Sequence, residues 1–129
     1  MSPILISVAR ILVVVLFVVS GAGKVMNPGG VVMAVAGKGL PYPQILAYLA
    51  IAAELGLGLL IALGFYARAA ALLLAVFTAA TIVLFHDFWH MTGDALRQNQ
   101  IHAMKNLSII GGLLMICAAG PGRLAINQR

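Results

Sequence analysis

The chain has 129 residues, a length that fits a single domain. Hydrophobic residues make up 63% of it and charged residues only 9%, whereas soluble domains are about half apolar and about a quarter charged. A small soluble fold leaves roughly a third of its unfolded surface exposed to water, so it could not hide this much apolar surface. The composition therefore excludes an ordinary soluble domain and predicts an integral membrane protein.

The net charge of +5 does not indicate nucleic-acid binding, because the basic side chains form no stripe. They stand singly at the ends of apolar runs, as expected for residues that set membrane topology and contact lipid headgroups: Lys24, Lys38, Arg68, Arg97, Lys105, Arg123 and Arg129. The single cysteine, Cys117, lies in an apolar run and excludes an internal disulfide or a CxxC dithiol relay.

The first apolar run, residues 4–22, has about the ~20 residues needed to cross a bilayer. Its "VVSGA" end resembles a signal-peptide cleavage site, but no positive charge precedes the run and Arg10 lies inside it, so we expect a membrane span. The next apolar stretch, "VVMAVAGKGL", is too short to span. We expect a short interfacial helix there, ended by Gly37 and Gly39.

Three further spans are predicted, at residues 44–64, 68–86 and 102–119. Glu54 interrupts the second span, Gly64 ends it, and "FYAR" makes a turn into the third. A polar segment separates the third span from the fourth, and "GPGR" stops the fourth. The predicted fold is therefore an all-α, integral membrane four-helix bundle that forms one domain over residues 1–129, with small residues in the spans allowing close packing.

Four spans place both termini on one side of the membrane. Lys and Arg are equally frequent on the two sides, and the acidic residues of the other side break the tie only weakly, so we expect cytoplasmic termini. An internal echo, Ala9-Arg10 at the start of the first span and Ala67-Arg68 at the start of the third, suggests two similar helical hairpins in parallel orientation.

Two charges lie within predicted spans, Arg10 and Glu54. Each would cost ~2.5–3.5 kcal/mol near the bilayer centre if unpaired. Their estimated depths from the terminal side, about 9 Å and about 15 Å, are within reach of an arginine side chain. We therefore predict an intramembrane Arg10–Glu54 ion pair, either a structural strut or a proton or ligand site; a protonated, neutral Glu54 is the third alternative.

The stretch "LFHDFWHMTGD", residues 84–94, interrupts an otherwise apolar chain with two histidines and two aspartates. His86 and His90 are four residues apart and would share one side of a helix, a spacing that suits zinc or haem iron. A metal site needs three or four ligands, and the further candidates are Asp87, Asp94 and His102. No metal site is predicted, because nothing in the sequence brings such a set together.

Two other interpretations of this stretch remain open. Trp89 and the neighbouring aromatic residues would suit an interfacial belt at headgroup level. A polar pocket for an organic ligand is the second, and a quinone would fit it, because its head needs hydrogen-bond donors and its tail needs gaps between helices. The candidate ligand-binding residues are Lys24, His86, Trp89, His90 and Asn106, and no catalytic residue is identified.

Several motifs resemble the DoxX family of small bacterial membrane proteins, and the resemblance runs over residues 6–126. The motifs are "ARILVVVLFVVSGAGKV", "AAELGLGLLIALGFYAR", "FHDFWHMTGD", "MKNLSIIGGLL" and "GPGRLAI". The tail differs, because many relatives have Ser-Leu-Asp where this chain continues with residues 124–127. The resemblance implies a four-helix membrane fold and a place in a bacterial plasma membrane. It implies redox function only by association with a thiosulfate:quinone oxidoreductase, and it carries over these polar positions: Arg10, Ser20, Lys24, Glu54, Arg68, His86, Trp89 and Asn106.

Two hypotheses for function follow. The chain either binds a quinone or a similar lipid-soluble ligand and works with a partner oxidoreductase, or it is a non-catalytic anchor or assembly subunit of a larger membrane complex. Besides the lipid bilayer, the expected partners are a redox protein, a larger complex or further copies of the chain. No cofactor other than a quinone is indicated.

Overall fold

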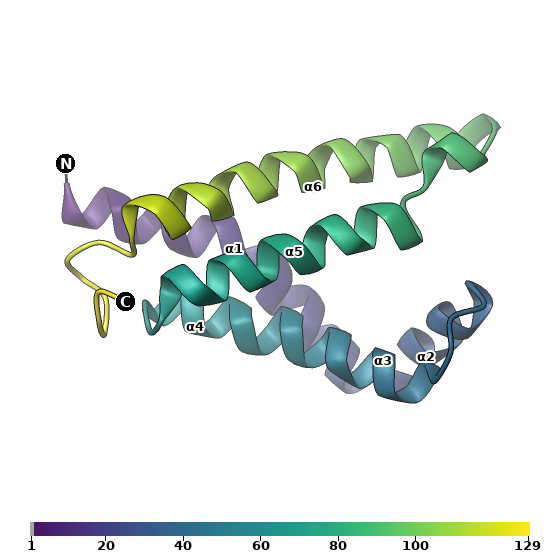
Figure 1. The fold of residues 1–129 in the computed structure, drawn as a ribbon, viewed down its shortest axis with the longest axis horizontal. Coiled ribbons are helices and arrows are strands. Elements are labelled where there is room, and N and C mark those ends of the chain that lie inside the picture. Colours follow the sequence, from purple (N-terminus) through teal and green to yellow (C-terminus); the bar gives the residue numbers. More distant parts are fainter. Residues whose placement is uncertain (1) are drawn as a thin grey trace.

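Four long helical segments make up most of the protein, and the computed structural model describes residues 2–129 of it (Figure 1). The four segments are α1 (Pro3–Met26), the continuous segment α3 (Pro43–Ile51), η1 (Ala52–Leu57) and α4 (Gly58–Leu63), α5 (Ala67–Phe85), and α6 (Gly93–Ala119). Each is long and apolar enough to cross a membrane. The short helix α2 (Pro28–Gly37) lies between the first two, and the predicted all-α fold with an interfacial helix is confirmed.

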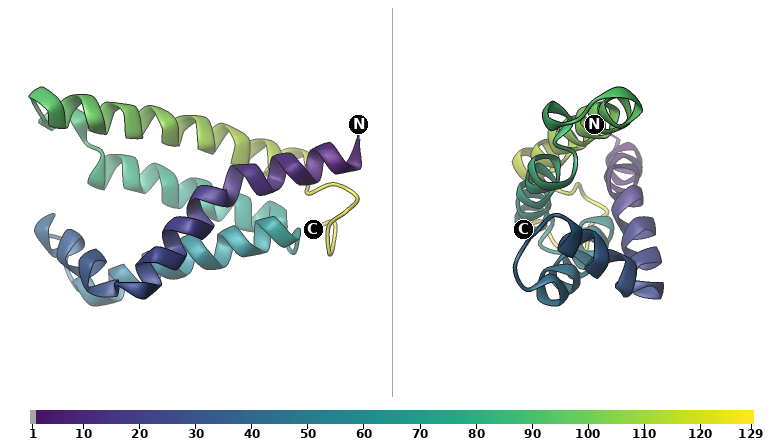
Figure 2. Two further views of the ribbon diagram at one scale, coloured as in Figure 1. Left: turned by 180° about the vertical axis from the view of Figure 1, so that it is seen from behind. Right: turned by 90° about the vertical axis from the view of Figure 1, so that its right-hand side faces the viewer.

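The helices form two layers that converge at one end and diverge at the other (Figures 1 and 2). One layer holds α1 and the α3–η1–α4 segment, and the other holds α5 packed along α6. We call the converging end, where α1 and α5 begin, the terminal end, and the diverging end, where α2 lies, the α2 end. The C-terminal segment also lies at the terminal end, as four consecutive spans require.

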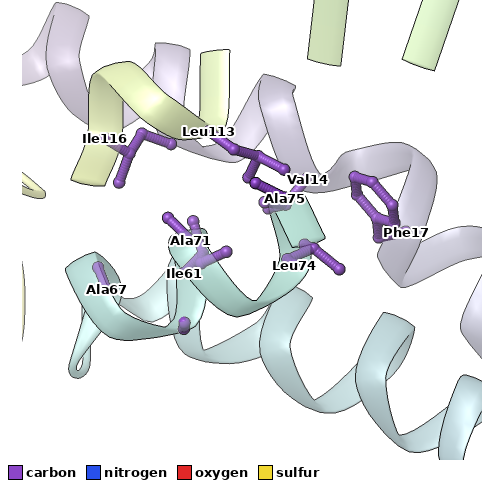
Figure 3. Packing of buried hydrophobic residues seen from close by; sticks show 10 residues of the cluster. Val14, Phe17, Ile61, Ala67, Ala71, Leu74, Ala75, Leu113 and Ile116 are labelled. Atoms are coloured by element: carbon purple, nitrogen blue, oxygen red, sulfur yellow. The ribbon is translucent and has the colours of Figure 1, made fainter. Parts of the chain in front are cut away.

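The hydrophobic core fills the converging half of the bundle (Figure 3). Helix α5 faces it with alanines at Ala67, Ala71 and Ala75, and these small side chains let neighbouring helices approach closely. Leu74 and Ile61 fill the space between the helices and are fully buried. This core holds the terminal end together and leaves the α2 end less tightly packed.

The register between α1 and the second span is set by Gly21. A Cβ atom added to Gly21 would lie 2.9 Å from both the Cβ and the backbone nitrogen of Leu55, so only glycine allows this approach. Residue 21 therefore lies level with residue 55. Because the two helices cross at this point, the N-terminal part of α1 extends well towards the terminal end.

Helix α6 is longer than its apolar stretch. It begins at Gly93, whereas the sequence prediction placed the span from residue 102. The segment "DALRQNQIHAMKN" is helical and continues α6 past its apolar part towards the α2 end (Figure 1). Hydropathy marks the apolar length of a helix, but hydrogen bonding of the backbone continues wherever the residues are good helix formers. Polar side chains at positions 102, 105 and 106 are therefore held rigidly on a helix.

The C-terminal segment folds back onto the terminal end. The backbone N–H groups of Ile126 and Asn127 donate to the carbonyl oxygens of Leu63 (3.2 Å) and Gly64 (3.1 Å), and the Asn127 side chain accepts from the backbone N–H of Tyr66 at 3.0 Å. Ile126 and Asn127 thus hold the turn between the second and third spans.

Candidate ligand-binding site

A cavity of about 910 Å³ lies between the two layers at the α2 end. Its walls come from α1, α2, α3 and η1 on one side and from α5 and α6 on the other. Most of its surface is apolar, contributed by residues such as Phe17, Leu49 and Phe77, and its polar groups come from a few side chains. A large apolar pocket with a few convergent polar groups is the usual form of a small-molecule site.

Lys24 and Glu54 form an ion pair on one wall of this cavity. Lys24 Nζ lies 2.6 Å from Glu54 Oε1, and both residues line the cavity. Glu54 is only 7% exposed and sits in η1, a wide π-helical turn within the second span. Turns of this kind are frequent at functional sites in α-helices.

The predicted Arg10–Glu54 pair is wrong, because Glu54 pairs with Lys24. The depth estimate assumed that the start of the first span and the end of the second span lie level at the terminal side. The Gly21–Leu55 contact instead places Glu54 near the end of α1 that carries Lys24, about three helical turns beyond Arg10.

Arg10 donates hydrogen bonds to backbone carbonyl groups rather than to a carboxylate. Its buried guanidinium donates to the carbonyl oxygens of Pro121 and, at 3.4 Å, Leu124. Arg68 does the same at the end of α6, where it donates to the carbonyl oxygens of Cys117, at 2.9 Å, and Ala118. Helix C-termini carry partial negative charge, which stabilises Arg68 there, whereas Arg10 contacts carbonyl groups of the segment that follows α6. Arg10 is therefore a structural element of the terminal end, far from the cavity.

The two arginines also occupy matching places. Arg10 Nη1 lies 2.8 Å from the position that a Cβ on Gly64 would take, and Arg68 Nη2 lies 2.8 Å from the corresponding position on Gly120. Each arginine stands near the start of one span, and each glycine ends the next span along the chain. The echo between the two halves of the sequence thus corresponds to the same contact made twice.

The opposite wall of the cavity carries His86, His102 and Asn106. The rings of His86 and His102 stack with centroids 5.0 Å apart, and His86 Nδ1 lies 3.0 Å from the Asn99 side-chain oxygen. Asn106 is buried, and its amide group donates to the Thr81 hydroxyl at 3.4 Å. This wall therefore offers imidazole and amide groups at fixed positions.

Three of the five predicted ligand-binding residues, Lys24, His86 and Asn106, line the cavity, and two do not. Trp89 and His90 lie on η2 (Phe88–His90), where the Trp89 residue is 50% exposed and packs edge-on against Phe88. Helix α5 ends at Phe85, so His86 and His90 do not share a helix face as predicted. The prediction from the histidine spacing assumed an α-helix through both residues, and this segment is not one.

His90 and Asp87 take part in a surface cluster that follows His86, a residue of the cavity wall. Lys38 Nζ lies 3.0 Å from one Asp87 oxygen, and His90 Nδ1 lies 3.2 Å from the other. Lys38 follows α2, whereas Asp87 follows α5, so this bridge joins the two layers where they diverge. Asp94 lies apart from the cluster and pairs with Arg97 at 3.1 Å.

No group of three or more histidine, cysteine, aspartate or glutamate side chains that could hold a metal ion occurs within residues 2–129. His102, weighed as a metal ligand, instead stacks on His86.

Sequence reasoning did not include His102, Lys105 or Thr81 among the ligand-binding residues, and it considered a ligand site at Glu54 only together with Arg10, yet these three residues and Glu54 line the cavity. The four-residue spacing of polar residues could have indicated part of this site. His102 and Asn106 are four residues apart on α6, as are Ser20 and Lys24 on α1, so each pair shares one helix face.

Comparison with known proteins agrees with this architecture. The DoxX family model matches residues 5–87. The inner membrane protein YphA of Escherichia coli (strain K12) is 39% identical over 127 residues, which cover 98% of this chain and 91% of that protein. The inner membrane protein YqjF of the same strain is 38% identical over 121 residues, covering 94% and 88%. No solved structure matches the chain. With a family match over more than half of its length and two relatives that span nearly all of it, this four-span membrane protein belongs to the DoxX family.

Proposed function

We propose that this protein binds a quinone or a similar lipid-soluble ligand in the cavity between its two layers and works with a partner oxidoreductase. The cavity is the observation that carries the proposal. A volume of about 910 Å³ accommodates an aromatic head and part of a prenyl tail, and the apolar walls suit the tail. The chain's own residues would bind and orient the ligand, and the electrons would come from the partner.

The polar groups of the cavity suit a head with two opposite oxygen atoms. Lys24 stands on one wall, and His86 and Asn106 stand on the other, so donors face the cavity from both sides. A quinone ring carries one carbonyl on each side, and each carbonyl accepts hydrogen bonds. The proposed binding mode therefore spans the cavity from α1 to α6.

Extraction and stability measurements test this proposal. The protein is purified from membranes in mild detergent and extracted with solvent, and the extract is analysed for quinones by mass spectrometry. Addition of a short-chain benzoquinone should raise the melting temperature of the parent and of His90→Ala, whose side chain lies outside the cavity, and should raise that of His86→Ala less. Absence of quinone from the extract, together with an unchanged melting temperature, would refute it; co-purification with other membrane proteins alone would then favour the anchor-subunit hypothesis.

We also propose that both termini face the cytoplasm. All three acidic residues lie towards the α2 end, where each of them pairs with a basic side chain: Glu54 with Lys24, Asp87 with Lys38 and Asp94 with Arg97. The terminal end holds Arg10, Arg68, Arg123 and Arg129 with no carboxylate side chain among residues 2–129. Positive charge is retained on the cytoplasmic side of membrane proteins.

A further inference from the structure

Glu54 has an unused hydrogen-bonding capacity beside the cavity. Its Oε1 atom accepts a hydrogen bond from the Lys24 ammonium group, whereas Oε2 is buried and has no hydrogen-bond partner anywhere in residues 2–129. Two other side chains contain buried atoms in the same condition, Ser7 and Arg10, but neither of them lines the cavity. Glu54 is therefore the one such group that a cavity ligand could reach, after a rotation of its carboxyl group.

We infer that the cavity prefers the reduced, hydroxyl-bearing form of its ligand, with a ring hydroxyl donating to Glu54 and accepting from Lys24. This inference rests on the proposed function, because it specifies which redox form of a quinone-like ligand is bound. It concerns binding alone and requires no electron transfer.

The hydrogen-bonding chemistry of the two forms supports this preference. A carboxylate only accepts hydrogen bonds and an ammonium group only donates them. A hydroxyl group does both, so it can bridge Glu54 and Lys24. A quinone carbonyl can accept from Lys24 but offers nothing to Glu54, and it would leave Oε2 without a partner. Hydrogen bonds to a charged acceptor are roughly twice as strong as neutral ones, so this difference is large.

The surroundings of the pair strengthen the argument. Lys24 lines the cavity with a side chain that is 35% exposed, so its remaining N–H groups are accessible to a ligand. The Glu54 side chain is only 10% exposed, and apolar residues such as Phe17 and Ala53 line the cavity beside it. In such an environment water competes little with a ligand for the hydrogen bond to Glu54. A ligand hydroxyl would therefore bind more strongly here than at a hydrated surface.

The experiment compares three ligands on the same purified protein. They are a short-chain benzoquinone, its quinol, and the O-dimethyl ether of that quinol, measured without oxygen by thermal shift and by calorimetry. The quinol should bind about tenfold or more tightly than the quinone, which corresponds to one charge-assisted hydrogen bond. The ether keeps the ring and tail but lacks the donor, so it should lose this advantage.

Glu54→Gln should bring the quinol and quinone affinities close together, whereas Asp94→Asn, which changes an exposed carboxylate outside the cavity, should leave their ratio unchanged. If Glu54→Gln does not fold, the comparison of the three ligands on the parent protein still tests the inference. Equal affinities for quinol, quinone and ether, or tighter binding of the quinone, would overturn the inference and leave quinone binding intact. Failure of all three to bind would overturn the proposed function as well.

Discussion

Lys24 Nζ and Glu54 Oε1 lie 2.6 Å apart and join the last turns of α1 to the π-helical turn of the second span. The contact neutralises a carboxylate that would otherwise stand alone within an apolar segment. It also places both charges on the wall of the cavity between the two layers. The same two side chains thus join two helices of the bundle and line the proposed ligand-binding site.

Breaking this pair should destabilise the protein. Lys24→Gln and Glu54→Gln should each lower the free energy of unfolding by ~1–3 kcal/mol, less than for a fully buried pair because Lys24 is partly exposed. The double variant should lose less than the sum of the two, since neither partner is left charged and alone. Denaturation in detergent micelles measures all three. The matched control is the exposed pair Asp94–Arg97, where Arg97→Gln should change stability by ~0.5 kcal/mol or less.

Arg10 should anchor the C-terminal segment. Arg10→Met leaves the carbonyl oxygens of Pro121 and Leu124 without their donor, at a cost of ~1–3 kcal/mol. Residues 120–129 should then be cut faster by an added protease and exchange their amide hydrogens sooner. Arg123→Met is the control, because Arg123 belongs to the same segment and its side chain is exposed. Equal protease sensitivity of the two variants would contradict the anchoring role.

Gly64 should tolerate no side chain. Its φ is +72°, and a Cβ atom there would lie 2.4 Å from the Cβ and 2.8 Å from the Cα of Ala125. Gly64→Ala should therefore destabilise the protein by ~1–3 kcal/mol, through backbone strain and displacement of the C-terminal segment. Gly111→Ala serves as control, because nothing lies within 4 Å of its added methyl group and the residue is helical. That variant should be neutral or more stable by up to ~1 kcal/mol, as thermal unfolding would show.

The Lys38–Asp87 bridge should slow the exchange of a ligand bound in the cavity. It joins the segment after α2 to the segment after α5, while α2 itself packs on α1 and α3. Lys38→Glu should speed ligand release several-fold, and adding Asp87→Lys should restore the slow rate by reversing both charges. Stopped-flow measurement of release checks both variants. High salt should reproduce part of the effect on the parent protein, because the bridge is partly exposed. An identical release rate for parent and Lys38→Glu would refute this role.

Cytoplasmic termini can be tested with single cysteines. Cys117→Ser removes the native thiol, and Asp94→Cys or Arg123→Cys then introduces one exposed thiol at the α2 end or the terminal end. A membrane-impermeant maleimide should label Asp94→Cys in intact cells and Arg123→Cys only after permeabilisation. The reverse labelling pattern would invert the orientation.

The number and order of the membrane spans could be predicted because lipid imposes a simple length rule. Twenty apolar residues cross the bilayer, and Gly64 and Gly120 each end a span at the predicted place. The start of α6 could not be found in this way. Its first turns carry polar residues, and hydropathy does not register a helix that continues beyond its apolar part.

Partners across the bundle were harder to predict than the bundle itself. The Arg10–Glu54 pair was inferred from depths measured along separate helices, but depth says nothing about how far one helix slides past another. That sliding is set by the approach of Gly21 to Leu55, a contact invisible without three-dimensional packing. The hydrogen bonds from Arg10 to carbonyl groups were equally hidden, because backbone atoms carry no sequence signature.

The π-helical turn at Ala52–Leu57 holds one residue more than an ordinary α-helical turn would. Residues on either side of it are thereby rotated relative to each other by about 100°, one residue's step around an α-helix. This offset allows Glu54 to meet Lys24 while Gly58 still packs on Val18. A homologue that lacks one residue in this stretch could keep only one of these two contacts. The length of this segment should therefore distinguish relatives that keep the charged pair on the cavity wall from relatives that do not.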